Sequence, residues 1–87
     1  MISVEHSEKL KRLGDLLRLL RTKKKLSQTQ IAFELGISRT QYQSIERGST
    51  NFGIITLYRL AEVLEVEPKT LLDTKKKREP TTKKSGN

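Results

Sequence analysis

Residues 28–47 read QTQIAFELGISRTQYQSIER, and this stretch decides the fold. Its apolar residues recur at spacings of three and four on either side of a single glycine, Gly36, which is typical of two short amphipathic helices joined by a turn. The apolar positions are Ile31, Ala32, Leu35, Ile37, Tyr42 and Ile45. Because Ala32 is small where the two helices would cross, the pattern predicts close packing, with the polar faces turned outward.

The second of these helices has a polar face on which no apolar position falls. Its residues are Ser38, Arg39, Thr40, Gln43, Ser44 and Arg47. Guanidinium, amide and hydroxyl groups pair with base edges and phosphates when a helix lies in the major groove of DNA. The stretch therefore predicts a helix-turn-helix that binds double-stranded DNA through this face.

Some of these side chains also have a purely structural interpretation. Arg47 at the helix end would compensate the helix dipole equally well. Gln43 and Ser44 are also residues that an ordinary solvated helix presents. Helical spacing places Tyr42 on the apolar face rather than against bases, whereas Phe33 fits either the edge of the core or a partner surface.

Two serines mark the starts of these helices. Ser27 is followed three residues later by Gln30, and Ser38 by Gln41, which is the serine-to-glutamine form of a capping box. Gly48 follows the second helix and can adopt the left-handed conformation without a steric penalty. These signals predict one helix after Ser27 and another after Ser38, the second ending at Gly48.

The first predicted helix runs from near Ser7 to near Lys24. Its apolar stripe comprises Leu10, Leu13, Leu17 and Leu20, widened by Leu16 and Leu19. The basic cluster 23–25 falls at its C-terminal end, where cations either complement the dipole or attract phosphate.

Two further helices are expected after residue 53. One spans about residues 54–64, with Gly53 as its cap and with Leu57, Leu60, Ala61 and Leu64 on one face. Pro68 fits the first position of a short fifth helix, in which Leu71 and Leu72 are the apolar anchors. The prediction is an all-α, compact five-helix domain over residues 1–74, followed by a flexible, disordered basic tail at 75–87.

Composition restricts what such a chain can do. With 87 residues and 33% hydrophobic residues, it has room for one small domain with a modest core. It has no cysteine and one histidine, His6, so we expect neither a disulfide nor a metal site. No nucleophile and base set or carboxylate cluster is apparent, and we expect no cofactor and no enzymatic activity.

The net charge of +8 is unevenly distributed. Residues 75–87 hold six basic residues and one acid, a net of +5, which leaves +3 for the other 74 residues. The nearly balanced charge of residues 1–74 is compatible with selective rather than indiscriminate binding of polyanions. The longest apolar run, residues 31–33, is far shorter than a membrane span of about 20 residues, and we expect a cytoplasmic protein with no membrane association.

From residue 10 to residue 72 the chain resembles the lambda-repressor and Cro-like family, also called the XRE family. The resemblance is carried by Leu-Ser-Gln at 26–28, by Ile-Glu-Arg-Gly at 45–48, and by Thr-Leu and Leu-Ala at 56–57 and 60–61. It implies five helices, of which the second and third read DNA, and a two-fold dimer that binds an inverted-repeat operator. Family members act as phage repressors, restriction-modification controllers and antitoxins.

The resemblance also assigns roles to individual positions. It implies that Ser27 and Gln28 hold a phosphate at a helix N-terminus, in agreement with the attraction of such termini for anions. It assigns base and nearby phosphate contacts to Ser38, Arg39, Thr40, Gln43 and Ser44. Among these, Arg39 is the first choice for reading guanine. It further implies a partly buried, structural ion pair between Arg21 and Glu46.

Three residues depart from the family pattern. Phe52 stands where many members have proline, Gly53 replaces a hydroxyl cap, and Glu65 stands at a position that is commonly glycine. A left-handed Glu65 would cost on the order of 1 kcal/mol.

The combined expectation is a homodimeric transcriptional regulator, acting as a repressor, with Leu71, Leu72 and the residues around the end of the fourth helix at the dimer surface. The alternative is a protein-interaction module in which the same fold holds a toxin or another regulator, because fold alone does not fix function.

Overall fold

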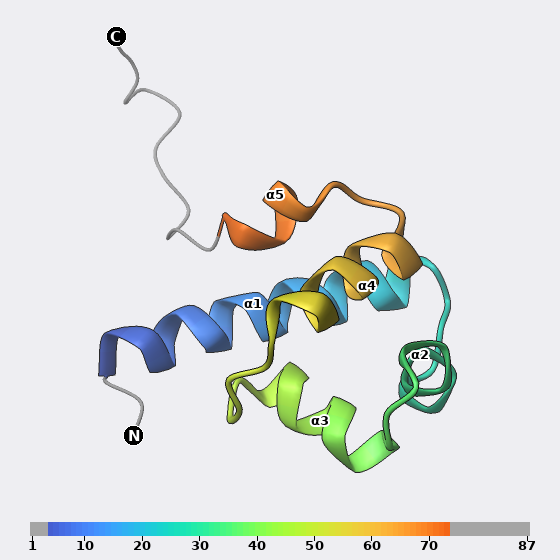
Figure 1. The fold of residues 1–87 in the computed structure, drawn as a ribbon, viewed down its shortest axis with the longest axis horizontal. Coiled ribbons are helices and arrows are strands. Elements are labelled where there is room, and N and C mark those ends of the chain that lie inside the picture. The colour runs from blue at the N-terminus through green and yellow to red at the C-terminus, as the bar shows by residue number, and fades with distance from the viewer. Residues whose placement is uncertain (1–3, 74–87) are drawn as a thin grey trace, which may run out of the picture.

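The computed structural model describes residues 4–73, which form five helices and no strand (Figure 1). The helices are α1 (Val4–Lys23), α2 (Gln28–Leu35), α3 (Arg39–Arg47), α4 (Ile54–Leu64) and α5 (Pro68–Leu72). The all-α, five-helix prediction is confirmed, although α1 begins at Val4 rather than near Ser7. The predicted tail, 75–87, lies outside the described residues.

The local signals in the sequence set the helix ends. The Ser27 hydroxyl accepts from the Gln30 backbone N–H at 3.0 Å, and the Gln30 side chain accepts from the Ser27 N–H at 2.7 Å. The same reciprocal pair joins Ser38 and Gln41. Gly36 ends α2 with φ of 74°, a conformation that glycine adopts without strain. The short α2 and α3 are therefore fixed at both ends by local interactions.

The helices surround one core. In Figure 1, α3 lies on one side of the long α1 and α5 on the other, and both pack against α1. α2 packs against α3 and α4. The largest fully buried side chains among the described residues are Leu17, Ile31, Tyr42, Leu60 and Leu71, one from each helix. This packing leaves the outer side of α3 uncovered.

Three expectations about apolar residues are wrong. Leu71 has no exposed surface because α5 packs against both α1 and α4, so it anchors α5 in the core as expected but does not belong to a dimer surface. Leu72, the next residue, is 60% exposed and is therefore not an anchor of α5 in the core. Leu19 is 56% exposed and does not extend the buried stripe of α1.

The helix α1 approaches the end of α3 very closely. A Cβ atom on Gly14 would lie 2.1 Å from the carbonyl oxygen of Glu46, and one on Gly48 would lie 2.6 Å from the Cα of Lys11. The two segments can approach each other this closely because neither Gly14 nor Gly48 has a side chain. Gly48 was predicted as a helix end, whereas no local sequence signal indicates the role of Gly14.

Glu65 does adopt the left-handed conformation, with φ of 60°, where it ends α4. Its carboxylate accepts a hydrogen bond from the Lys24 ammonium at 2.7 Å, and this bond lowers the pKa of Glu65. One member of the basic cluster 23–25 is thus paired within the protein. Across the described residues no helix is apolar over a length that would cross a bilayer.

Candidate nucleic-acid interface

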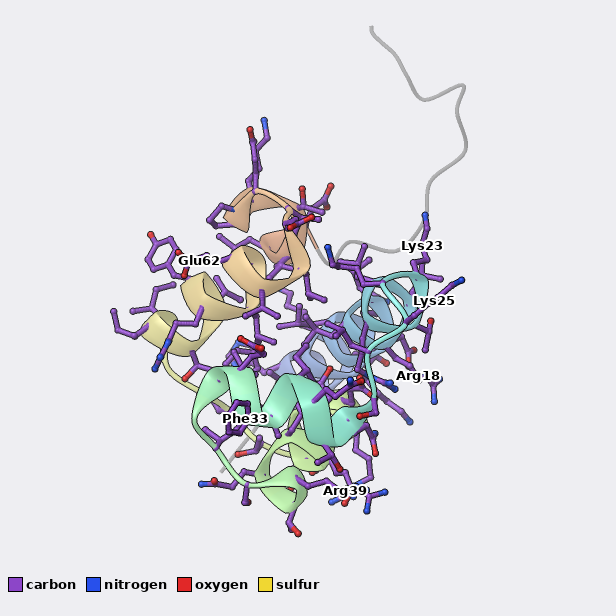
Figure 2. The ribbon with its side chains drawn as sticks, turned by 90° about the vertical axis from the view of Figure 1, so that its right-hand side faces the viewer. Arg18, Lys23, Lys25, Phe33, Arg39 and Glu62 are labelled. Atoms are coloured by element: carbon purple, nitrogen blue, oxygen red, sulfur yellow. The ribbon has the colours of Figure 1, made fainter. Side chains whose placement is uncertain are left out.

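The outer face of α3 is open to solvent. Arg39, Thr40 and Arg47 are exposed, and Gln43 and Ser44 are half-buried. Figure 2 shows Arg39 extending away from the core at the edge of the molecule. The Arg39 guanidinium makes no hydrogen bond or ion pair with the described residues. The residues predicted from spacing therefore do share one accessible helix face.

The hydroxyl groups on this segment have local partners. Ser27 and Ser38 use their hydroxyl oxygens as caps for α2 and α3. The Ser44 hydroxyl donates to the Thr40 carbonyl at 3.3 Å, one helical turn earlier. These caps occupy the N–H groups of the serine and of the residue three positions later, and the N–H groups of the two residues between them lie at a helix N-terminus, where anions are favoured.

The expected ion pair between α1 and α3 is present and buried. Arg21 Nε donates to Glu46 Oε2 at 2.6 Å, and Arg21 Nη2 donates to Glu46 Oε1 at 3.3 Å. The side chains are only 10% and 5% exposed. Arg21 Nη1 also donates to the Leu26 carbonyl at 2.8 Å, which connects the same arginine to the start of α2. The pair thus fixes α3 against its support.

Tyr42 adds a polar contact that helical spacing did not reveal. Its ring is fully buried, as expected, but its hydroxyl donates to Glu46 Oε2. Burial raises the pKa of Tyr42, and the hydrogen bond to Glu46 raises it further, so the phenol remains protonated. Burial by itself would raise the pKa of Glu46, but hydrogen bonds from Arg21, Tyr42 and Gln28 outweigh it and hold this pKa below its ordinary value.

Two glutamines continue this network to the surface. Gln28 Nε2 donates to Glu46 Oε1 at 3.1 Å, and Gln43 Nε2 donates to Gln28 Oε1 at 3.1 Å. Gln28 therefore has partners at both ends of its amide. The resemblance to the family had implied only a phosphate contact for this residue. No sequence spacing could reveal the contact, because the two glutamines lie on different helices.

A surface pocket of about 490 Å³ lies where α1, α2 and α3 meet. Its lining residues are Lys11, Asp15, Arg18, Gln28, Gln43, Glu46 and Arg47. In Figure 2, Arg18 and Arg39 lie on the same side of the molecule, whereas Phe33 lies toward the other end of α2. Lys11 and Arg18 add positive charge from α1, and neither residue was predicted as part of the site.

A metal site in a protein requires several ligand side chains in one arrangement. Between residues 4 and 73, no group of three or more His, Asp or Glu side chains is arranged to hold a metal ion. Phe33 is 81% exposed, which places it outside the core. The exposed face of α3 consists of amide, hydroxyl and guanidinium groups.

The fold and this site define a helix-turn-helix protein. A family model described as helix-turn-helix matches residues 17–71, and the chain belongs to this family, with a DNA-binding domain of the lambda-repressor and Cro-like (XRE) type. Over 61 residues the chain is 38% identical to the control protein C.BamHI of Bacillus amyloliquefaciens, a match that covers 69% of this chain and 75% of that protein.

Two solved structures share the fold. The restriction-modification controller protein C.AhdI from Aeromonas hydrophila is 40% identical, with a TM-score of 0.68 over 71% of this chain and 94% of the controller. SinR, the master regulator for biofilm formation, was solved in complex with DNA. It is 34% identical, with a TM-score of 0.65 over 70% of this chain and 98% of SinR.

Proposed function

We propose that this protein is a sequence-specific DNA-binding regulator of transcription that places α3 in the major groove. The observation that carries the proposal is the free guanidinium of Arg39 at the exposed start of α3. An arginine in this position is able to donate two hydrogen bonds to the O6 and N7 atoms of guanine. In this proposal the protein binds DNA and catalyses no reaction.

The surroundings of α3 support this proposal. The buried contacts of Glu46 with Arg21 and Tyr42 hold α3 in place, so the direction of its outer face is fixed before DNA binds. Lys11 and Arg18 lie beside α3 and offer positive charge to the phosphates that flank a groove. SinR, whose fold is similar, was solved in complex with DNA.

We further propose that the protein acts as a homodimeric repressor on an inverted repeat. Three exposed apolar residues, Ile54, Ile55 and Tyr58, lie on the first turns of α4. Together with Leu72 they replace the buried Leu71 as the proposed dimer surface. A two-fold dimer would place its two copies of α3 in successive major grooves, about 34–36 Å apart.

Selection of bound duplexes from a random pool tests the proposal. We expect the selected sequences to be palindromic, with half-site centres separated by about one helical turn. Selected sequences without symmetry would contradict the dimer, and a pool without enrichment would contradict sequence-specific binding. Affinity for a selected duplex should fall with salt, with a log-log slope of about 0.9 per phosphate contact.

Arg39→Ala tests which side chain reads a base. We expect this variant to relax the preference at one position of each half-site by roughly 1–3 kcal/mol, because it removes a paired donor from one base. Arg59→Ala, which removes an exposed arginine of α4, is the control and should leave the preference unchanged. An equal loss of affinity on every sequence would make Arg39 a phosphate contact.

A further inference from the structure

The buried carboxylate of Glu46 determines the orientation of the Gln28 amide. The lowered pKa of Glu46 keeps this group ionised at neutral pH, and an ionised carboxylate only accepts hydrogen bonds. The Gln28 atom that lies 3.1 Å from Glu46 Oε1 must therefore be Nε2. The other end of this amide, Oε1, consequently faces Gln43.

The orientation of the Gln43 amide follows in the same way. Gln28 Oε1 is an acceptor, so the Gln43 atom 3.1 Å from it must be Nε2. A reversed Gln43 amide would bring two acceptor oxygens together. The order of donors and acceptors from Glu46 through Gln28 to Gln43 is thus fixed at its buried end, where Arg21 and Tyr42 hold the carboxylate.

The outer edge of the Gln43 amide remains available. Gln43 Oε1 accepts no hydrogen bond from the described residues, and every buried side-chain oxygen or nitrogen among them has a partner, so this oxygen reaches solvent. Gln43 Nε2 retains a second hydrogen. Gln43 lies four residues after Arg39 and four before Arg47, which places it on the same side of α3 as both arginines.

We propose that Gln43 reads an adenine and that Gln28 is the positioning residue that gives its amide the required direction. Adenine offers a donor at N6 beside an acceptor at N7, which matches an amide that presents its oxygen and one N–H. Guanine offers acceptors at both O6 and N7 and does not match that oxygen. The inference rests on the proposed function and adds a specificity determinant to it.

The test uses the full-length protein and duplexes derived from its selected site. Gln43→Ala first identifies the position at which base preference depends on Gln43. At that position we expect wild-type protein to bind adenine about tenfold more tightly than guanine, the factor that corresponds to a bidentate pair of ordinary strength. Gln28→Met should remove most of this ratio, because the unrestrained Gln43 amide is then free to turn over.

A double-mutant cycle separates positioning from a direct contact. If Gln28 acts through Gln43, Gln28→Met should not change the adenine-to-guanine ratio further in the Gln43→Ala background. Thr29→Ala, on the same exposed turn of α2, is the matched control and should keep the wild-type ratio. Circular dichroism establishes that each variant is folded. If Gln28→Met does not fold, Gln28→Asn keeps an amide on α2 but shortens its reach to Gln43, and the same loss is expected.

Three results would overturn the inference. A uniform loss of affinity for all duplexes in Gln28→Met would make Gln28 a phosphate contact. An unchanged adenine-to-guanine ratio in that variant would remove its positioning role, and a position dependent on Gln43 that prefers another base would refute adenine reading. Each of these three results leaves sequence-specific binding by the wild-type protein intact. Wild-type protein that selects no sequence would instead refute the proposed function itself.

Discussion

Glu46 is the residue on which the geometry of the interface most depends. Its carboxylate accepts hydrogen bonds from Arg21 on α1, Gln28 on α2 and Tyr42 on α3. Removing one member of a buried ion pair leaves the other charge without compensation, which costs more than the pair contributes. One carboxylate therefore joins the supporting helix to both helices of the helix-turn-helix.

Glu46→Ala should lower the free energy of unfolding by on the order of 3 kcal/mol, because Arg21 remains buried without its partner. Thermal unfolding followed by circular dichroism measures the effect. Glu62→Ala, at an exposed position of α4, is the control and should have little effect. An unchanged melting midpoint in Glu46→Ala would show that the pair does not stabilise the fold.

The ionisation of Glu46 should also make stability depend on pH. Its pKa in the folded protein lies below the ordinary value of 4.5, so the unfolded chain binds the proton first as the pH falls. The stabilisation is therefore fully present above about pH 4.5 and is lost as the pH falls through the lower, folded pKa. The stability difference between wild-type protein and Glu46→Gln, from urea unfolding, should shrink over this acidic range. A difference independent of pH would exclude the linkage.

At the scale of elements, the position of α3 depends on how closely α1 approaches it. Gly14 lies against the carbonyl oxygen of Glu46, and Gly48 lies against the backbone of α1 at Lys11. The backbones are thus in contact at two places where side chains would hold them apart. This contact brings Lys11 and Arg18 beside Gln43 and Arg47 of α3.

Gly14→Ala should destabilise the protein by about 2 kcal/mol, because the new Cβ requires the two helices to shift apart. Helix propensity alone predicts the opposite sign, a gain of about 0.5–1 kcal/mol. Chemical unfolding therefore distinguishes the two effects by sign. Gly53→Ala, at a position with no atom within 4 Å of the new Cβ, is the control and should cost less than about 1 kcal/mol.

At the scale of the whole molecule, exposed apolar residues are unevenly placed. Ile54 and Ile55 are 55% and 65% exposed at the start of α4, and Tyr58 follows one turn later. Burying such side chains against a second copy would add to the stability of a domain that is too small to bury a large core alone. The same contact would set the distance between two copies of α3.

Ile55→Glu should therefore weaken dimerisation, because it places a charge in the proposed interface. We expect sedimentation velocity to show a shift toward monomer and affinity for a palindromic duplex to fall, while each half-site is still recognised. Leu19→Glu, at a similarly exposed position of α1, is the control. A dimer of unchanged strength in Ile55→Glu would place the interface elsewhere.

The sequence by itself determined the helices and the exposed polar side of α3. Ser27 pairs with Gln30, and Ser38 pairs with Gln41, in each case three residues apart. Gly36 and Gly48 each end a helix within one turn. These interactions are local, so the sequence is sufficient to predict them. Helical periodicity likewise separated the buried Tyr42 from the exposed Arg39.

Only the tertiary structure decided how these helices meet. Gln28 and Gln43 lie on separate helices, and Gly14 contacts a carbonyl far along the chain, so neither contact has a local signal. Leu71 and Leu72 are identical in chemistry, yet one is fully buried and the other exposed because the direction from which α5 packs selects between them. Side-chain periodicity fixes which residues share a face, whereas the partner of that face depends on packing among all five helices.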